Sequence, residues 1–312
     1  MKISDKEILN IALSQCSFLR GREKLLLSEK LDGIEEFSLL SIKDISELIG
    51  RRVNPKKFEP ELIQRYSEKA VKIMEMYGIS SVSFNEKDFP PLLREIPDAP
   101  FMIFYRGVLP NPELPAIAMV GTRRPTGEGI QEALSLGREF AELGIPVVSG
   151  LAYGIDTYSH RGCFEAEVKR VSAVAVLACG PEGIYPKSNK KLAAKILEEG
   201  GCILSEYTPG TEPLAFRFPE RNRIISGLSR SVLIVEAPKK SGALITGEFA
   251  LEQGRDVYVC KTLLNSIQNE GCVNLAEQGA LAITSAKDIL NDWKYSLNEN
   301  NRQVSLFTDL KL

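Results

Sequence analysis

Short apolar segments alternate with amphipathic segments from residue 116 onward. The apolar segments span residues 116–121, 146–150, 172–180, 202–207, 231–237, 256–261 and 281–285. The segments between them, such as "GEGIQEALSLGREFAELG" and "NKKLAAKILEEGG", carry apolar residues at helical spacing. Continuous apolar strands that alternate with helices are typical of a parallel sheet covered on both faces. The sequence therefore predicts an α/β fold with a Rossmann-like, doubly wound, mostly parallel sheet.

The residues before this repeat have a different pattern. Segments such as "REKLLLSEKL" and "ELIQRYSEKAVKIMEMYG" predict helices, with Ser41 and Asp44 as start signals and Gly78 as a stop. A proline-rich stretch follows and contains one clear strand, "FMIFYRG", which we expect at an edge of the sheet. We therefore expect three parts, which are a small all-helical domain at 1–84, a Rossmann-like domain at 85–290 and a polar C-terminal tail at 291–312.

Composition excludes several classes of function. A net charge of −2 provides no global attraction for nucleic acid or lipid, so any such attraction must come from local clustering. The six cysteines form no Cys-x-x-Cys pair and the chain has one histidine, His160, so no metal site is predicted. Thiols within apolar runs fit a reducing compartment. With no signal peptide or apolar segment of membrane length, we expect a cytoplasmic protein without membrane association.

Glycines and polar or basic residues follow the ends of the predicted strands. Ligands of doubly wound sheets bind outside the carboxyl ends of the strands, where glycine N–H groups and helix N-termini attract anions. The candidate phosphate-binding residues in chain order are Gly121, Thr122, Arg123, Ser149, Gly150, Lys187, Arg221, Asn222, Arg223, Ser241 and Gly242. We therefore predict that this edge of the sheet binds phosphate.

The sequence motifs exclude some classes of phosphate-containing ligand. The Walker pattern is absent, "GTRRPTGEG" is not G-x-G-x-x-G, and Ser149 stands where a dinucleotide site favours an acid. No cofactor is therefore predicted. Cations spread over several strand ends favour a ligand with consecutive phosphates, such as a nucleic-acid strand. The aromatic candidates for stacking on its bases are Tyr153, Tyr185, Tyr207, Phe216 and Phe218.

Some of these residues have a structural alternative. Arg217, Arg221 and Arg223 could pair with Glu206, Glu220 or Glu236, and we expect at least one to do so, because a guanidinium beside a core needs a partner. His160 follows Asp156 by four residues and could be a catalytic base, but we favour a structural hydrogen-bonding role. Since the nucleophile pattern G-x-S-x-G is also absent, no catalytic residue is predicted.

Several motifs together resemble the DNA-processing protein A family, also called Smf or DprA. They include "VGTRRPTGEG", "SGLAYGIDTYSHRG", "YPKSN", "FPERNRIISGLS" and "VLIVEAPKKSGALITGEFALEQG", in the family's order and spacing over residues 85–290. The resemblance implies a homodimeric single-stranded DNA-binding protein of natural transformation that protects the strand, helps to load a RecA-type recombinase and is not an enzyme. It implies binding through the residues of "GTR", the Ser149-Gly150 pair, Lys187 of "YPKSN" and the residues of "RNR". The N-terminal part is similar to SAM-like or helix-hairpin-helix domains in layout, and no C-terminal winged helix is expected.

The chain departs from the family pattern in one loop, where Cys260-Lys261 replaces a Pro-Gly turn and Val273 replaces an asparagine. Two alternatives share the fold. One is a nucleotide phosphoribohydrolase that uses Glu236 and Glu248 as acid and base, although "KKSGALITGE" lacks the paired glycines of that family's loop. The other is a nucleotide-sensing module, which would prefer a small nucleotide to an oligonucleotide.

Overall fold

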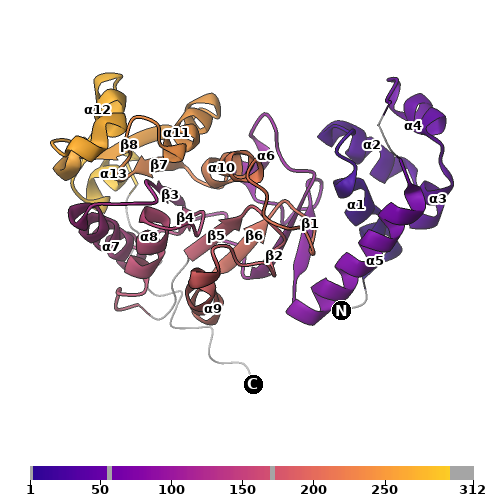
Figure 1. Ribbon diagram of the computed structural model, residues 1–312, viewed down its shortest axis with the longest axis horizontal. Coiled ribbons are helices and arrows are strands. Elements are labelled where there is room, and N and C mark those ends of the chain that lie inside the picture. Colours follow the sequence, from indigo (N-terminus) through magenta and orange to yellow (C-terminus); the bar gives the residue numbers. More distant parts are fainter. Residues whose placement is uncertain (1–2, 55–57, 169–172, 296–312) are drawn as a thin grey trace.

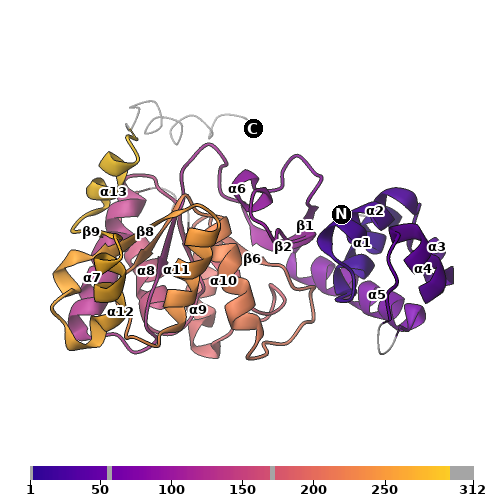
Figure 2. The same ribbon diagram turned by 90° about the horizontal axis from the view of Figure 1, so that it is seen from above.

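The computed structural model describes residues 3–54, 58–168 and 173–295. A group of helices at the N-terminal end lies beside a twisted sheet with helices on both of its faces (Figure 1, Figure 2). No helix within these described residues is long and apolar enough to cross a membrane. Most of the polar tail that the sequence predicts, residues 296–312, lies outside the described part of the chain.

The N-terminal helices begin and end where their capping residues predict. Ser41 accepts a hydrogen bond from the backbone N–H of Asp44, whose carboxylate accepts from the Ser41 N–H in return. Gly78 ends the last of these helices in the left-handed conformation, with φ of 61°. These helices are α1 (Asp5–Gln15), α2 (Gly21–Lys30), α3 (Ile34–Leu39), α4 (Ile42–Ile49) and α5 (Pro60–Tyr77).

The described residues that follow contain a nine-stranded sheet, in the order β1-β2-β6-β5-β4-β3-β7-β8-β9. Strands β3 to β9 are parallel, which confirms the predicted doubly wound fold. The strands are β1 (Ser80–Ser83), β2 (Met102–Gly107), β3 (Ile117–Val120), β4 (Val147–Ser149), β5 (Ala173–Leu177), β6 (Cys202–Ser205), β7 (Ser231–Ile234), β8 (Asp256–Cys260) and β9 (Leu281–Ile283).

Helices cover both faces because alternate strand residues point to opposite sides. Ile117 and Met119 of β3 face one core with α7, α8, α9 and α13, whereas Ala118 and Val120 face a second core with α6, α10, α11 and α12. The helices are α6 (Pro91–Arg94), α7 (Gly127–Glu142), α8 (Ile155–Cys163), α9 (Lys190–Glu198), α10 (Arg217–Gly227), α11 (Gly242–Glu252), α12 (Glu270–Glu277) and α13 (Ala286–Asp292), with short 3₁₀ helices at Lys187–Asn189, Lys261–Leu263 and Ile267–Asn269.

The first two strands differ from the expectation. β2 was expected at an edge, but it pairs antiparallel with β6 on one side and with β1 on the other, so β1 is the edge strand. β1 falls within residues 1–84, which the sequence assigned to helices alone. Its sequence, "SSVS", contains one apolar residue and therefore has no strand pattern to detect. Phe104 of β2 packs in the same core as helices α1 to α5, so that core joins the helices to the sheet.

The C-terminal packing reaches beyond residue 290. α13 ends at Asp292, whose carboxylate accepts a hydrogen bond from the hydroxyl of the buried Tyr258. Trp293 is also buried. The first residues of the predicted polar tail therefore belong to the packed core.

Asn269 organises the loop that departs from the family pattern. Its side chain is buried, accepts from the Ala237 N–H at 2.8 Å and donates to the Leu263 carbonyl at 3.1 Å. The Gly271 N–H also donates to the Ala237 carbonyl, at 2.9 Å, so this loop is held against the residues that follow β7.

Candidate nucleic-acid interface

A cleft of about 670 Å³ opens at the carboxyl ends of β3 and β7. The chain order reverses between these strands, since β4 lies on one side of β3 and β7 on the other. Such a switch point is where doubly wound sheets bind their ligands. The walls come from the loop after β3, the first turns of α10 and α11, and Tyr185. The predicted site residues that line the cleft are Gly121, Thr122, Arg123, Arg221, Asn222, Ser241 and Gly242.

A buried carboxylate holds the loop after β3. Glu236 at the end of β7 is fully buried, and its Oε2 accepts from both the N–H and the hydroxyl of Thr126 at 3.0 Å. The Thr122 N–H donates to the backbone carbonyl of Glu236 at 2.7 Å. Glycine is required at position 129, because a Cβ atom there would lie 1.8 Å from Oε2 of Glu236. The N-terminus of α7 is therefore neutralised within the protein, and the loop that carries Arg123 is held in place.

Arg123 is exposed and forms one wall of the cleft with two aromatic rings. Its guanidinium lies 5.5 Å from the centre of the Phe218 ring, and the Phe218 and Tyr185 rings are themselves 5.5 Å apart. Stacking on Phe218 orients the guanidinium without neutralising it. The wall therefore combines a positive charge with flat apolar surfaces, which are the two features that a nucleotide strand requires.

Arg221 lies at the floor of the cleft and has only 4% of its surface exposed. Its Nη1 donates to the Val176 carbonyl. Burial lowers the pKa of Arg221, and the negative charge of Asp156 opposes that shift. Burial in turn raises the pKa of Asp156, against the charge of Arg221 and the N–H groups of Gly150 and Ala152, which donate to it. The bond to Val176 and the burial of the side chain hold Arg221 in the floor and leave little of the guanidinium for a ligand.

Two predicted site residues lie beneath the cleft rather than on its surface. Ser149 is fully buried and donates to the Met119 carbonyl at 2.6 Å, which ties β4 to β3. Gly150 gives its N–H to Asp156, and a Cβ atom there would lie 2.0 Å from Nη1 of Arg221. The glycine thus makes room for an arginine. Both residues take part in internal packing and do not line the cleft, and their predicted contact with phosphate stays a prediction.

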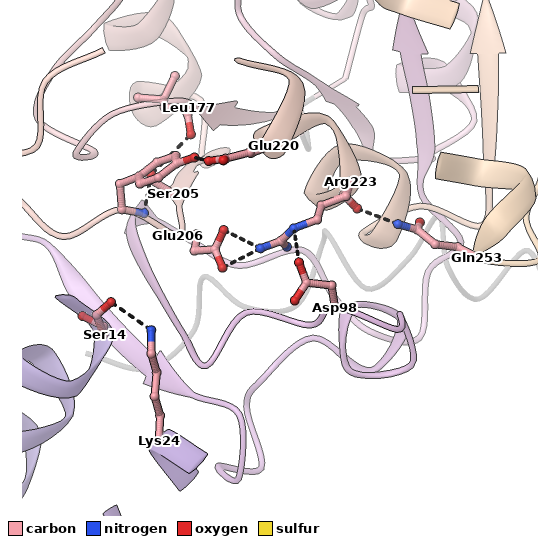
Figure 3. Close-up of polar contacts among 10 residues, drawn as sticks. Ser14, Lys24, Asp98, Leu177, Ser205, Glu206, Glu220, Arg223 and Gln253 are labelled. Atoms are coloured by element: carbon pink, nitrogen blue, oxygen red, sulfur yellow. Dashed lines mark hydrogen bonds and ion pairs between the residues drawn. The ribbon is translucent and has the colours of Figure 1, made fainter. Parts of the chain in front are cut away.

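Arg223 faces away from the cleft. Its Nη2 lies 2.6 Å from both carboxylate oxygens of Glu206, and its Nε lies 3.2 Å from Asp98 (Figure 3). Lys24 of α2 donates to the Ser14 carbonyl at 3.1 Å (Figure 3). Burial lowers the pKa of Lys24, and the negative charges of Cys16, Glu206 and Asp98 oppose this shift. These contacts confirm that at least one of the three arginines pairs with an acid. Arg223 does not line the cleft, and its predicted contact with phosphate stays a prediction.

The first turn of α11 forms the opposite wall. Ser241 caps this helix and Gly242 is its first residue, and a Cβ atom at Gly242 would meet nothing within 4 Å. Asn222 donates to the Gly242 carbonyl at 3.3 Å and so links α10 to this wall. Lys240 also lines the cleft. Lys187 is exposed beside the cleft, two residues after Tyr185, but does not line it.

The two glutamates that the phosphoribohydrolase alternative would use as acid and base do not lie together in the cleft. Glu236 is sealed beneath the loop, and Glu248 is exposed on α11 outside the cleft lining. His160 was expected to form structural hydrogen bonds, but neither ring nitrogen has a partner among the described residues. Complete burial lowers the pKa of His160 to about 3, so it stays neutral.

The sequence did not predict the apolar residues that line the cleft. Pro213, Ile225 and Ile245 line the cleft, but apolar residues carry no binding signal in a sequence because they are far more often core. Asp156 was expected to follow the second strand of the repeat, but no role in the cleft was predicted for it. It lines the cleft beside Arg221, and this position depends on the turn after β4, which no sequence pattern specifies.

Residues 80–294 match the family described as DNA recombination-mediator protein A. The chain belongs to this family. Among its curated relatives is DNA processing protein DprA of Streptococcus pneumoniae, 36% identical over 95% of this chain and 100% of that protein. Protein Smf of Synechocystis is 38% identical over 80% of this chain, which spans only 60% of that protein's length.

Two solved structures of DNA processing protein A resemble the fold. The Streptococcus pneumoniae protein superimposes with a TM-score of 0.71 at 33% identity and covers 96% of this chain and 100% of that one. The Helicobacter pylori protein, described for its unique single-stranded DNA binding mode, gives a TM-score of 0.62 at 28% identity over 70% of this chain and 98% of that one. The family match over residues 80–294 includes all the residues that line the cleft.

Proposed function

We propose that this member of the DNA recombination-mediator protein A family binds single-stranded DNA in the cleft between the loop after β3 and helix α11, as a mediator of recombination during DNA uptake. The observation that carries the proposal is the placement of Arg123. It is exposed and stacked on Phe218, and no carboxylate pairs with it among the described residues. A guanidinium held in this way is available to a phosphate, while Phe218 and Tyr185 are available to a base.

The electrostatics of the cleft support this assignment. The acidic Asp156 is offset by Arg221, so Arg123 and Lys240 give the lining a positive balance. Asn222, a residue type that can read a base edge, donates its side-chain N–H to the Gly242 carbonyl, and the Arg123 guanidinium stacks on Phe218. We therefore expect affinity without strong sequence preference, and a steep dependence on salt.

The family resemblance also implies protein partners for this chain. We propose that the chain forms a homodimer, protects the strand, and helps to load a RecA-type recombinase. We assign it no catalytic activity, because the Glu236 carboxylate accepts a hydrogen bond from the Thr126 hydroxyl and Glu248 lies outside the cleft lining. Six buried free thiols fit a reducing compartment such as the cytoplasm.

Fluorescence anisotropy with labelled single-stranded DNA, double-stranded DNA and single-stranded RNA across a salt series tests the proposal. Arg123→Ala should weaken binding to all single-stranded sequences alike and reduce the slope of log K against log salt by about 0.7, the value for one phosphate contact. Arg138→Ala is the matched control, since Arg138 forms only an exposed pair with Glu142 on α7. Equal affinities and slopes for Arg123→Ala and the wild type would refute the proposal.

A second arm of the assay addresses the nucleotide alternatives. AMP is added as a competitor and its breakdown is followed. Displacement of the oligonucleotide by low concentrations of AMP would favour a nucleotide-sensing module, and release of free adenine would favour the phosphoribohydrolase. We expect neither.

A further inference from the structure

A second hollow, of about 570 Å³, lies on the other side of the loop that carries Arg123. The two hollows share Arg123 as a lining residue, so this loop is a ridge between them. The second hollow is also lined by Arg124, Pro125, Ile130, Tyr153 and Tyr158. The proposed function accounts for none of these five side chains.

The backbone places Tyr153 beside this ridge. Gly154 has φ of 76°, and a Cβ atom there would lie 2.2 Å from the Thr122 carbonyl oxygen. The next residue, Ile155, donates its N–H to the same oxygen at 3.1 Å. Only glycine allows the turn after β4 to come so close to the ridge. Tyr153 therefore projects from a fixed turn, and half of its surface, 51%, remains exposed.

The chemistry of the second hollow repeats that of the cleft. A half-exposed ring offers a stacking surface, and Arg124 offers an exposed positive charge that no carboxylate pairs with among the residues the structure describes. The Arg124 N–H donates to the Thr122 hydroxyl at 3.2 Å, which fixes the backbone of the ridge. A ring on the turn after β4 and a guanidinium on the adjoining loop after β3 are the elements of a nucleotide subsite.

We infer that the strand held in the cleft continues across Arg123 into the second hollow, where one base stacks on Tyr153 and Arg124 holds a phosphate. This inference rests on the proposed function and extends it by one subsite. The cleft alone holds a short oligonucleotide, and the second hollow adds affinity only when the strand is long enough to cross the ridge.

The test compares oligothymidines of about four and about twelve nucleotides, a span typical of single-strand sites. Tyr153→Ala should leave binding of the short strand unchanged and weaken binding of the long strand about 5- to 10-fold, at the low end for loss of one stacked base. Tyr153→Phe should restore wild-type affinity, because it keeps the ring. Arg124→Ala should lower the salt slope by about 0.7 with the long strand only.

Tyr66→Ala is the control, because Tyr66 lies on α5 and is 53% exposed, close to the exposure of Tyr153. Wild-type affinity of Tyr153→Ala for both strands would overturn the inference and leave the proposed function intact. An equal loss for both strands would also overturn it, since Tyr153 would then act through the cleft. Failure of the wild type to bind either strand would instead refute the proposed function itself.

Discussion

Arg223→Ala tests whether the arginines beside the sheet brace the protein or bind DNA. The Arg223 side chain is 12% exposed and that of its main partner, Glu206, is 26% exposed. Removing one member of a fully buried pair costs about 3–5 kcal/mol, whereas an exposed pair contributes about 0–1 kcal/mol. This pair lies between those limits, and Lys24 stays close enough to offset part of the charge left on Glu206. We therefore expect a loss of about 2–3 kcal/mol of unfolding free energy.

Such a loss should be visible in thermal unfolding. At about 2–4 °C per kcal/mol for a chain of this order of size, Tm should fall by roughly 4–12 °C. Affinity for single-stranded DNA should stay within about twofold of the wild type, because Arg223 does not line the cleft. In a double-mutant cycle with Glu206→Ala, the two changes should be non-additive by about 1–3 kcal/mol.

The matched control is Arg138→Ala, which removes a pair whose side chains are 47% and 49% exposed and should shift Tm by no more than about 1–2 °C. The reasoning is refuted if Arg223→Ala unfolds at the wild-type temperature while its affinity for single-stranded DNA falls tenfold or more. That result would mean that the guanidinium leaves Glu206 and contacts the strand.

Three further changes test the cleft and its support. Phe218→Ala should weaken binding of single-stranded DNA about 5- to 100-fold by anisotropy, because it removes a stacking surface, and unchanged affinity would contradict that role. Gly129→Ala should lower the urea midpoint, because the added Cβ atom meets Glu236, and a midpoint equal to that of the wild type would show that the loop after β3 can move. The folded-state pKa of His160 is near 3, below the ordinary 6.5, so the unfolded chain binds a proton that the folded chain does not. Stability should therefore fall by about 1.4 kcal/mol per pH unit from pH 6.5 downward toward 3, and His160→Leu should remove this dependence between pH 7.5 and 5.5 in urea titrations.

Patterns that repeat along the chain predicted most of the fold. Seven parallel strands could be located because each is a continuous apolar run. Ser41 marked the start of a helix because its side chain caps that helix, and Gly78 marked the end of a helix because it adopts the left-handed conformation there. β1 was missed because hydrogen bonds to β2, rather than apolar residues of its own, make it a strand. Short edge strands depend on such partners, which one sequence does not reveal.

The site was predicted only in outline, for a different reason. The sequence predicted that Arg123, Arg221 and Arg223 lie at one edge of the sheet, but the structure gives each of them a different environment. Arg123 is open, Arg221 is buried under Gly150, and Arg223 is paired with Glu206. Which of these occurs depends on the direction of each side chain from its helix or loop, and that direction is set by tertiary packing rather than by spacing along the chain.

Photo-crosslinking tests the central claim most directly. Oligothymidine that carries a halogenated uracil at one position is irradiated with the protein, and the attachment sites are mapped by mass spectrometry. Bases that stack in the cleft should crosslink to Phe218 and Tyr185, and Arg123→Ala should reduce the yield. Crosslinks confined to the N-terminal helices, with neither ring labelled, would contradict the assignment of this cleft as the DNA-binding site.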